Sequence, residues 1–193
     1  MDVVLSRLRH LYRRAFQRIV TLVTIPPPDS HFFRAAVGWM ELKLPMESLK
    51  ELAQISPAFR CHIETLEIEW QVLAALLDWD TAFRIAEKTI TLHSTSITGW
   101  IHCAYAARRK SDGGLSRAFA VLLPAALKFP DEGLIRYNLA CYTAQLGELE
   151  AAWRWFEEAL HRDPDPSGTH SYKAMALKDE DLKSLWDKIR SLK

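Results

Sequence analysis

Hydrophobic residues along this chain recur at intervals of three and four, which is the spacing of one face of an α-helix. The pattern predicts a first helix over residues 3–23 and a last helix from about 179 to 191. Between them it predicts four pairs of helices, at 31–43 with 46–56, 60–77 with 80–93, 97–109 with 115–128, and 133–146 with 148–162. Because no segment alternates with period two, the sequence predicts an all-α protein.

Prolines mark two special places in this pattern. Pro26, Pro27 and Pro28 follow the first helix, and proline cannot continue a helix because it lacks the backbone N–H. Residues 26–30 are therefore interpreted as a Pro-rich linker, with Asp29 or Ser30 as the N-cap of the next helix. Pro124 lies inside the 115–128 segment, where the continuing apolar stripe predicts a kink rather than a break.

Small residues recur at one position of the second helix in each pair. They are separated by 34, 36 and 34 residues, and they are Ser48, Ala82, Ala118 and Ala152. A small residue where two helices cross lets their axes approach closely, and we expect Ala140 and Ala152 to face each other in this way. A two-helix unit of about 34 residues is the sequence signature of tetratricopeptide repeats.

The last pair resembles the tetratricopeptide repeat (TPR) family most closely. Its segment YNLA is followed at the family's spacing by Gly147, Leu149, Ala152, Phe156, Ala159, Leu160, Asp163 and Pro164. In the third pair, Trp100-x-x-Cys103-Ala104 resembles the family's W-x-x-L-G. The earlier pairs depart from the pattern, since Trp70 stands where a small residue is expected and Ser48 replaces alanine.

The resemblance covers residues 31–164 and implies a right-handed α-solenoid of TPR-like helical hairpins. Its units would be 31–56, 60–94, 97–130 and 133–164. Residues 1–25 would add an N-terminal basic amphipathic helix, 26–30 the linker, and 165–193 a C-terminal capping segment.

In the TPR family the first helix of each pair lines a concave groove. The resemblance therefore implies that a peptide or helix of a partner protein binds there. The positions that it places in the groove are Glu64, Glu67, Gln71, His102, Tyr105, Arg108, Arg109, Tyr137, Asn138, Cys141 and Gln145. Simpler interpretations stay open: the arginines can complement a helix C-terminus, the tyrosines can pack, and the glutamates can form a solvated face.

Composition narrows the functional classes. The formal net charge is +1, so no overall field favours nucleic acid or a membrane. The three cysteines are dispersed and form no CxxC pair, which indicates reduced thiols in a cytoplasmic protein. No glycine-rich phosphate loop, nucleophile elbow or HExxH motif occurs, and the Cys-His neighbours Cys61-His62 and His102-Cys103 point in different directions on a helix. We therefore expect no catalytic residues, no metal and no cofactor.

The first 25 residues differ from the rest in charge. They carry +4 of formal charge and the other 168 carry −3. The arginines that flank the apolar stripe are Arg7, Arg9, Arg13, Arg14 and Arg18. A basic amphipathic helix can lie in a membrane interface, so the alternative to the adaptor is a peripheral membrane scaffold. The same helix could instead cap the first repeat or mediate self-association.

Overall fold

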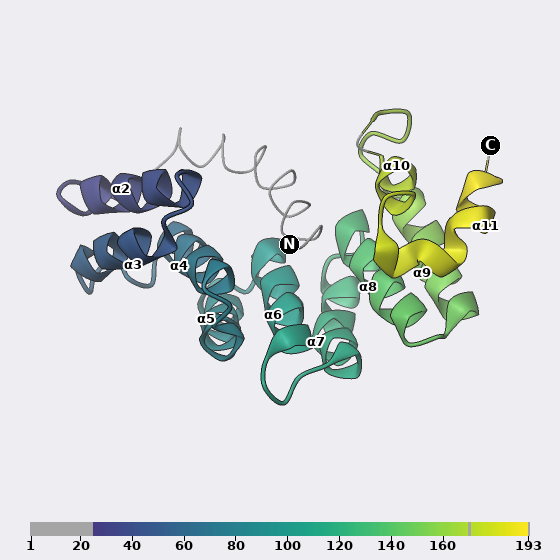
Figure 1. The fold of residues 1–193 in the computed structure, drawn as a ribbon, viewed down its shortest axis with the longest axis horizontal. Helices are drawn as coiled ribbons and strands as arrows, with labels where there is room; N and C mark the ends of the chain where they lie inside the picture. The colour runs from purple at the N-terminus through teal and green to yellow at the C-terminus, as the bar shows by residue number, and fades with distance from the viewer. Residues whose placement is uncertain (1–24, 170, 193) are drawn as a thin grey trace. The chain divides into compact units, whose positions relative to one another are not determined.

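The computed structural model describes residues 25–169 and 171–192, which form helices and no strand (Figure 1). Their helices come in four consecutive hairpins: α2 (Asp29–Glu41) with α3 (Pro45–Gln54), α4 (Ile63–Ala75) with α5 (Trp79–Leu92), α6 (Ile97–Arg109) with α7 (Leu115–Lys128), and α8 (Gly133–Gln145) with α9 (Leu149–Leu160). The expected all-α class and the four helical pairs are confirmed. The helix expected over 3–23 lies outside the described residues.

The chain divides into two compact units between Ser94 and Thr95. The described part of the first unit holds the hairpins α2/α3 and α4/α5, with a core that includes Ile25, Phe33 and Ile55. The second unit holds the hairpins α6/α7 and α8/α9 together with the C-terminal elements. Each unit thus contains two complete helical hairpins.

The four small residues that define the repeat are all fully buried. In the first hairpin the hydroxyl of Ser48 donates a hydrogen bond of 2.8 Å to the backbone carbonyl of Ala36 on the facing helix. This contact explains how serine replaces alanine there: it is small enough for the crossing, and its polar group is satisfied within the hairpin. The small-residue contact expected from the sequence is therefore present in α2/α3.

The second hairpin departs from the pattern at Trp70. By the repeat spacing, Trp70 occupies the position held by Ala36 in α2, Ala104 in α6 and Ala140 in α8. All three alanines are fully buried, and Trp70 is only 1 % exposed. Helices α4 and α5 also contact each other less extensively than the helices of the other three hairpins. The indole of Trp70 thus fills the space between α4 and α5. In the other three hairpins a closer approach of the two helices closes this space.

Three hairpin turns share one backbone motif. Each begins with a residue of positive φ directly after the C-cap of the first helix: Lys43 (62°), Leu77 (61°) and Gly147 (85°). The next residue donates its N–H back to a carbonyl five positions earlier, as Glu148 does to Thr143 at 3.1 Å. This is the Schellman arrangement, which satisfies carbonyls at the end of the helix. Glycine adopts it without the steric penalty that a side chain brings.

We expect Gly147→Ala to lower the free energy of unfolding by about 1 kcal/mol, because alanine is strained at this φ. The matched control is Gly38→Ala inside α2, where a Cβ would meet no atom within 4 Å. That change should raise stability by about 0.5–1 kcal/mol, because alanine favours the helix. Urea unfolding followed by circular dichroism measures both. Equal effects of the two substitutions would contradict the turn assignment.

The start of α2 differs from the prediction. Its N-cap is Pro28, and no side chain caps the helix. The carboxylate of Asp29 instead accepts hydrogen bonds from the backbone N–H of Ser56 at 2.7 Å and from its hydroxyl at 2.8 Å. Asp29 therefore joins the beginning of α2 to the residues after α3, and the predicted capping role of Asp29 or Ser30 is wrong.

A buried arginine connects the last two hairpins of the second unit. Arg136 on α8 is 5 % exposed. Its guanidinium donates to the carbonyls of Ala126 and Phe129 at the end of α7 and to that of Glu132, at 3.0–3.1 Å. It also pairs with the carboxylate of Glu158 on α9 at 3.1 Å. Helix α7 itself runs unbroken through Pro124 to Lys128, as the apolar stripe predicts, and the expected kink stays a prediction.

The C-terminal segment is more divided than the predicted helix at 179–191. It consists of α10 (Tyr172–Ala176), the 3₁₀ helix η1 (Glu180–Leu185) and α11 (Trp186–Arg190). In a 3₁₀ helix residues three apart lie on one side, so Leu182 and Leu185 are buried together. They pack in one core with Trp153 and Phe156 of α9. The segment thus covers the apolar face of the last hairpin.

Candidate functional site

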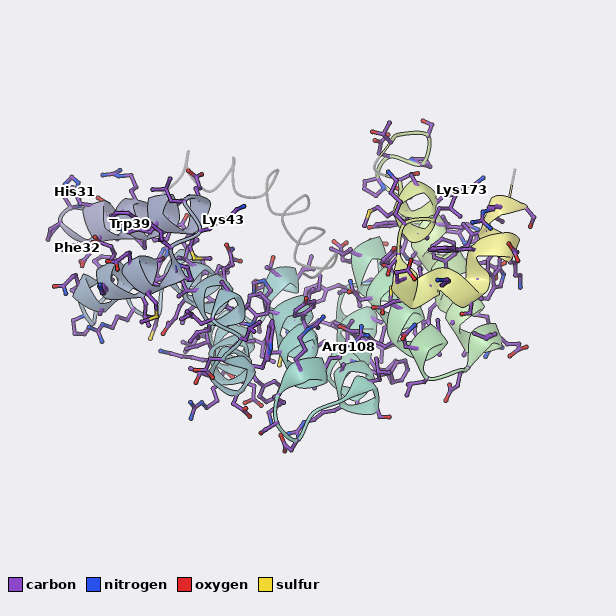
Figure 2. The ribbon with its side chains drawn as sticks, in the orientation of Figure 1. His31, Phe32, Trp39, Lys43, Arg108 and Lys173 are labelled. Carbon is purple, nitrogen blue, oxygen red and sulfur yellow. The ribbon has the colours of Figure 1, made fainter. Side chains whose placement is uncertain are left out.

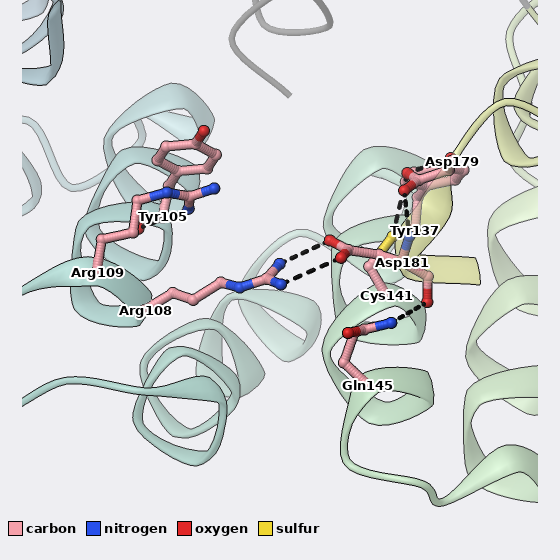
Figure 3. A network of polar contacts seen from close by, with 8 residues as sticks. All are labelled: Tyr105, Arg108, Arg109, Tyr137, Cys141, Gln145, Asp179 and Asp181. Atoms are coloured by element: carbon pink, nitrogen blue, oxygen red, sulfur yellow. Dashed lines mark hydrogen bonds and ion pairs between the residues drawn. The ribbon is translucent and has the colours of Figure 1, made fainter. Parts of the chain in front are cut away.

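The candidate site is a polar network in the second unit, built from α6, α8 and η1 (Figure 3). Ser96 fixes the start of α6 by accepting a hydrogen bond of 3.0 Å from the N–H of Gly99. On α8, three of the expected groove residues recur every four positions and so share one face of the helix: Tyr137, Cys141 and Gln145. Figure 3 shows that this face meets Asp179 and Asp181 of the C-terminal segment.

Asp179 is buried and has two roles. One carboxylate oxygen accepts the N–H of Asp181 at 2.9 Å and so caps η1. The other accepts the hydroxyl of Tyr137 at 2.9 Å and faces the thiol of Cys141 at 3.6 Å. An acidic side chain at this position also complements the positive end of the helix dipole. The contacts with α8 were not predicted.

Asp181 contacts the first helix of each hairpin in this unit, α6 and α8. Arg108 at the end of α6 (Figure 2) donates two hydrogen bonds to its carboxylate, at 2.6 and 3.1 Å. The side-chain amide of Gln145 donates to its backbone carbonyl at 3.1 Å. Burial alone would lower the pKa of Arg108, but the hydrogen bond and charge of Asp181 outweigh burial and raise it. Such a two-pronged ion pair is both directional and strong.

The remaining groove candidates of this unit lie in different surroundings. His102 is 2 % exposed, and burial lowers its pKa to about 3, so the ring is neutral. Arg109 lies over the ring of Tyr105, with its guanidinium carbon 3.6 Å from the ring centre, and Tyr105 is itself buried. Asn138 donates to the carbonyl of Leu134 in its own helix. Arg108, Tyr137, Cys141 and Gln145 are thus brought together, whereas His102 lies among core residues.

The groove candidates of the first unit all lie on α4. Glu64 is buried, with a carboxylate oxygen 3.5 Å from Nδ1 of His62. Burial, and secondarily the charge of Glu64, raises the pKa of Glu67 from 4.5 to about 7. Gln71 is half-buried one turn further along. This face of α4 is therefore less acidic at neutral pH than the sequence alone indicates.

Glu67 should make stability depend on pH. The folded chain retains a proton on Glu67 up to about pH 7, whereas an unfolded carboxyl releases it near 4.5. The protonated Glu67 therefore stabilises the folded chain at low pH. This stabilisation, about 1–3 kcal/mol, is lost as pH rises through this interval. We expect Glu67→Gln to flatten the pH profile of urea unfolding between pH 4.5 and 8. Glu87→Gln, at an exposed position of α5, is the control, and identical profiles for Glu67→Gln and wild type would refute the assignment.

One cluster has the residue types of a metal site. Ligand atoms of Cys141, Asp179 and Asp181 lie within 4.8 Å of one another. The carboxylates of Asp179 and Asp181 already accept hydrogen bonds from Tyr137 and Arg108, and the guanidinium supplies the positive charge beside them. The cluster is therefore explained as a hydrogen-bond network that holds the C-terminal segment on α8.

Comparison with known proteins identifies the fold. No protein-family model and no curated protein matches the sequence. Among solved structures, the crystal structure of MamA, a TPR-type helical solenoid, matches with a TM-score of 0.61 and 14 % sequence identity. The match covers 84 % of this chain and 95 % of MamA. The chain therefore has a TPR-like helical repeat fold. In the described parts of the chain, no helix is long and apolar enough to cross a membrane.

Proposed function

We propose that this chain, with its TPR-like fold, is a non-catalytic adaptor that binds a peptide or helix of a partner protein along the first helices of its hairpins. One observation carries the proposal. Side chains from the first helices of two successive hairpins, α6 and α8, already bind a continuous stretch of polypeptide at residues 179–181. They bind two carboxylates and one backbone carbonyl at the start of the 3₁₀ helix η1, and such contacts suit a peptide or short helix held along these helices. We propose a cytoplasmic location as well, on the basis of three dispersed cysteines that form no CxxC pair.

Site-specific photo-cross-linking tests the adaptor function. A photoreactive amino acid at Gln71, on the first helix α4, should cross-link a defined protein in the source cell. The matched position is Arg84, which is exposed on the second helix α5 of the same hairpin. We expect the partner to be recovered from position 71 and not from position 84. Recovery from 84 alone, or the same proteins from both positions, would overturn the assignment of the first helices.

The second proposal is attachment to a membrane surface through the basic segment 1–25. The observation that favours it is the +4 charge of these residues beside a broad apolar stripe. A cap on the first repeat competes with it, and Ile25 at the end of this segment is buried in the core of α2/α3. Flotation with anionic liposomes at low salt separates the two. Binding that is lost in Arg7→Gln/Arg14→Gln/Arg18→Gln supports the membrane, and no binding by the intact chain removes it.

A further inference from the structure

Arg108, Tyr137, Cys141 and Gln145, here called the receptor surface, contact a segment with a specific chemistry. The segment presents two carboxylates separated by one residue, with a main-chain carbonyl on the second. The guanidinium of Arg108 donates two parallel hydrogen bonds to one planar carboxylate, and the hydroxyl of Tyr137 donates to the other carboxylate. Glu180, the residue between them, is exposed and pairs only with Lys183 among the described ion pairs. The contacts therefore specify Asp-x-Asp rather than any acidic run.

Residues 179–185, here called the resident segment, are buried to different depths along their length. Behind the two aspartates, Leu182 and Leu185 are buried in the core with α9. The ion pair itself lies at the edge of the protein, with side-chain exposures of 21 % for Arg108 and 17 % for Asp181. Solvent-accessible contacts at the end of an element open more readily than its buried part. The Arg108–Asp181 pair can therefore open first, whereas Asp179 is only 1 % exposed and must be uncovered after it, while the leucines keep the rest of the segment anchored.

We infer that the receptor surface binds an acidic Asp-x-Asp segment of a partner protein, and that residues 179–181 occupy it as a competitor. The inference rests on the proposed adaptor function and names the chemistry of the partner. A tethered segment has a high effective concentration, so a free segment of equal quality binds weakly until the tether is weakened. The intact chain is thus a closed form, and binding of the partner opens it at α6 and α8.

A peptide competition experiment tests the inference. The probe is a labelled peptide with the sequence of residues 176–187, ALKDEDLKSLWD, and the control peptide has asparagine in place of both receptor-bound aspartates. The full-length chain is used as wild type and as Asp179→Asn/Asp181→Asn, which weakens the resident segment. We expect the double variant to bind the probe about 10-fold or more tightly than wild type does, and to bind the asparagine peptide far more weakly. Adding Arg108→Gln to the double variant should reduce binding of the probe by a similar factor.

Hydrogen exchange of the wild-type chain provides a second measurement that needs no substitution. A saturating excess of the probe should increase the exchange of amides at 180–182 and leave those of the core helix α9 unchanged. The inference is overturned by equal binding of both peptides, by binding that survives Arg108→Gln, or by unaltered exchange in wild type.

Without peptide, we expect the double variant to sediment with the same proportions of monomer and oligomer as wild type. New dimers that Arg108→Gln abolishes would assign the surface to a second copy of this chain instead. The outcomes are independent of the cross-linking at Gln71, which lies in the other unit. A partner captured there with no effect of the probe would leave the adaptor function standing and remove only the acidic motif.

Discussion

Trp70→Ala is expected to lower the free energy of unfolding of the first unit by about 3–5 kcal/mol. Trp70 is among the largest fully buried side chains of the described chain, and it stands where the other hairpins have alanine. Alanine at position 70 would restore the repeat pattern in the sequence. The α4/α5 pair is nonetheless built around the indole, because its helices are in less extensive contact than those of the other hairpins. The substitution therefore leaves a cavity that the hairpin can close only in part.

Hydrogen exchange of the α4 and α5 amides measures this effect within one unit, without assuming that both units unfold together. Gln71→Ala, at the half-buried neighbouring position, should change stability by no more than about 0.5 kcal/mol. A loss below about 1 kcal/mol for Trp70→Ala would mean that the helices move together and form the closer crossing of the other hairpins.

The second large effect is expected for Arg136→Met, which should destabilise the second unit by about 3–5 kcal/mol. Methionine retains much of the apolar stem of Arg136 but none of its five N–H donors. The carbonyls of Ala126, Phe129 and Glu132 would lose their charged partner, and two of these residues belong to the end of α7. Replacing the solvated partner Glu158 should cost much less, because its side chain is about half exposed.

Exchange rates of the last α7 amides and the first α8 amides provide the measurement. The control is Arg154→Met on the exposed face of α9, which should stay within about 0.5 kcal/mol of wild type. If both arginine variants were equally stable, the carbonyls at the end of α7 would have to be satisfied by water, and the connecting role of Arg136 would be wrong.

The hairpins could be predicted from the sequence because their determinants are local and repeated. Ser48, Ala82, Ala118 and Ala152 recur at a nearly constant interval, and each is buried where the repeat places it. The insertion of two residues in the third unit falls in the turn that ends at Gly114. Local pattern and packing agree at these positions, so helical periodicity alone located the elements.

The contacts of the candidate site could not be predicted in this way. Asp181 binds Arg108, which precedes it by 73 residues, and no periodic pattern links the two positions. Asp179 caps η1 through a local contact, and nothing in that local pattern indicates its second contact, with Tyr137 on α8. Asp29 shows the reverse case: a capping residue by position is used instead for a tertiary contact with Ser56. An acidic residue beside a helix has two competing uses, and only the surrounding structure decides between them.

The short helix α10 was missed for a different reason. It has five residues, too few for a periodic signal, and it follows the irregular stretch 163–171. Its determinants are Ser171, which caps it by accepting the N–H of Ala174, and the buried pair Tyr172 and Ala176. A serine followed by two apolar residues four positions apart is a weak signal that becomes meaningful only when a neighbouring surface is known.

The C-terminal elements limit where an additional hairpin can be inserted into this chain. Leu182 and Leu185 of η1 share one core with Trp153 and Phe156 of α9, which is the face that a fifth hairpin stacked after residue 164 would need. A duplicated copy of the last hairpin is therefore accommodated only upstream of this segment, for example between residues 130 and 133, where a turn separates α7 from α8. Homologues of different length should differ there and retain the closing segment as a unit.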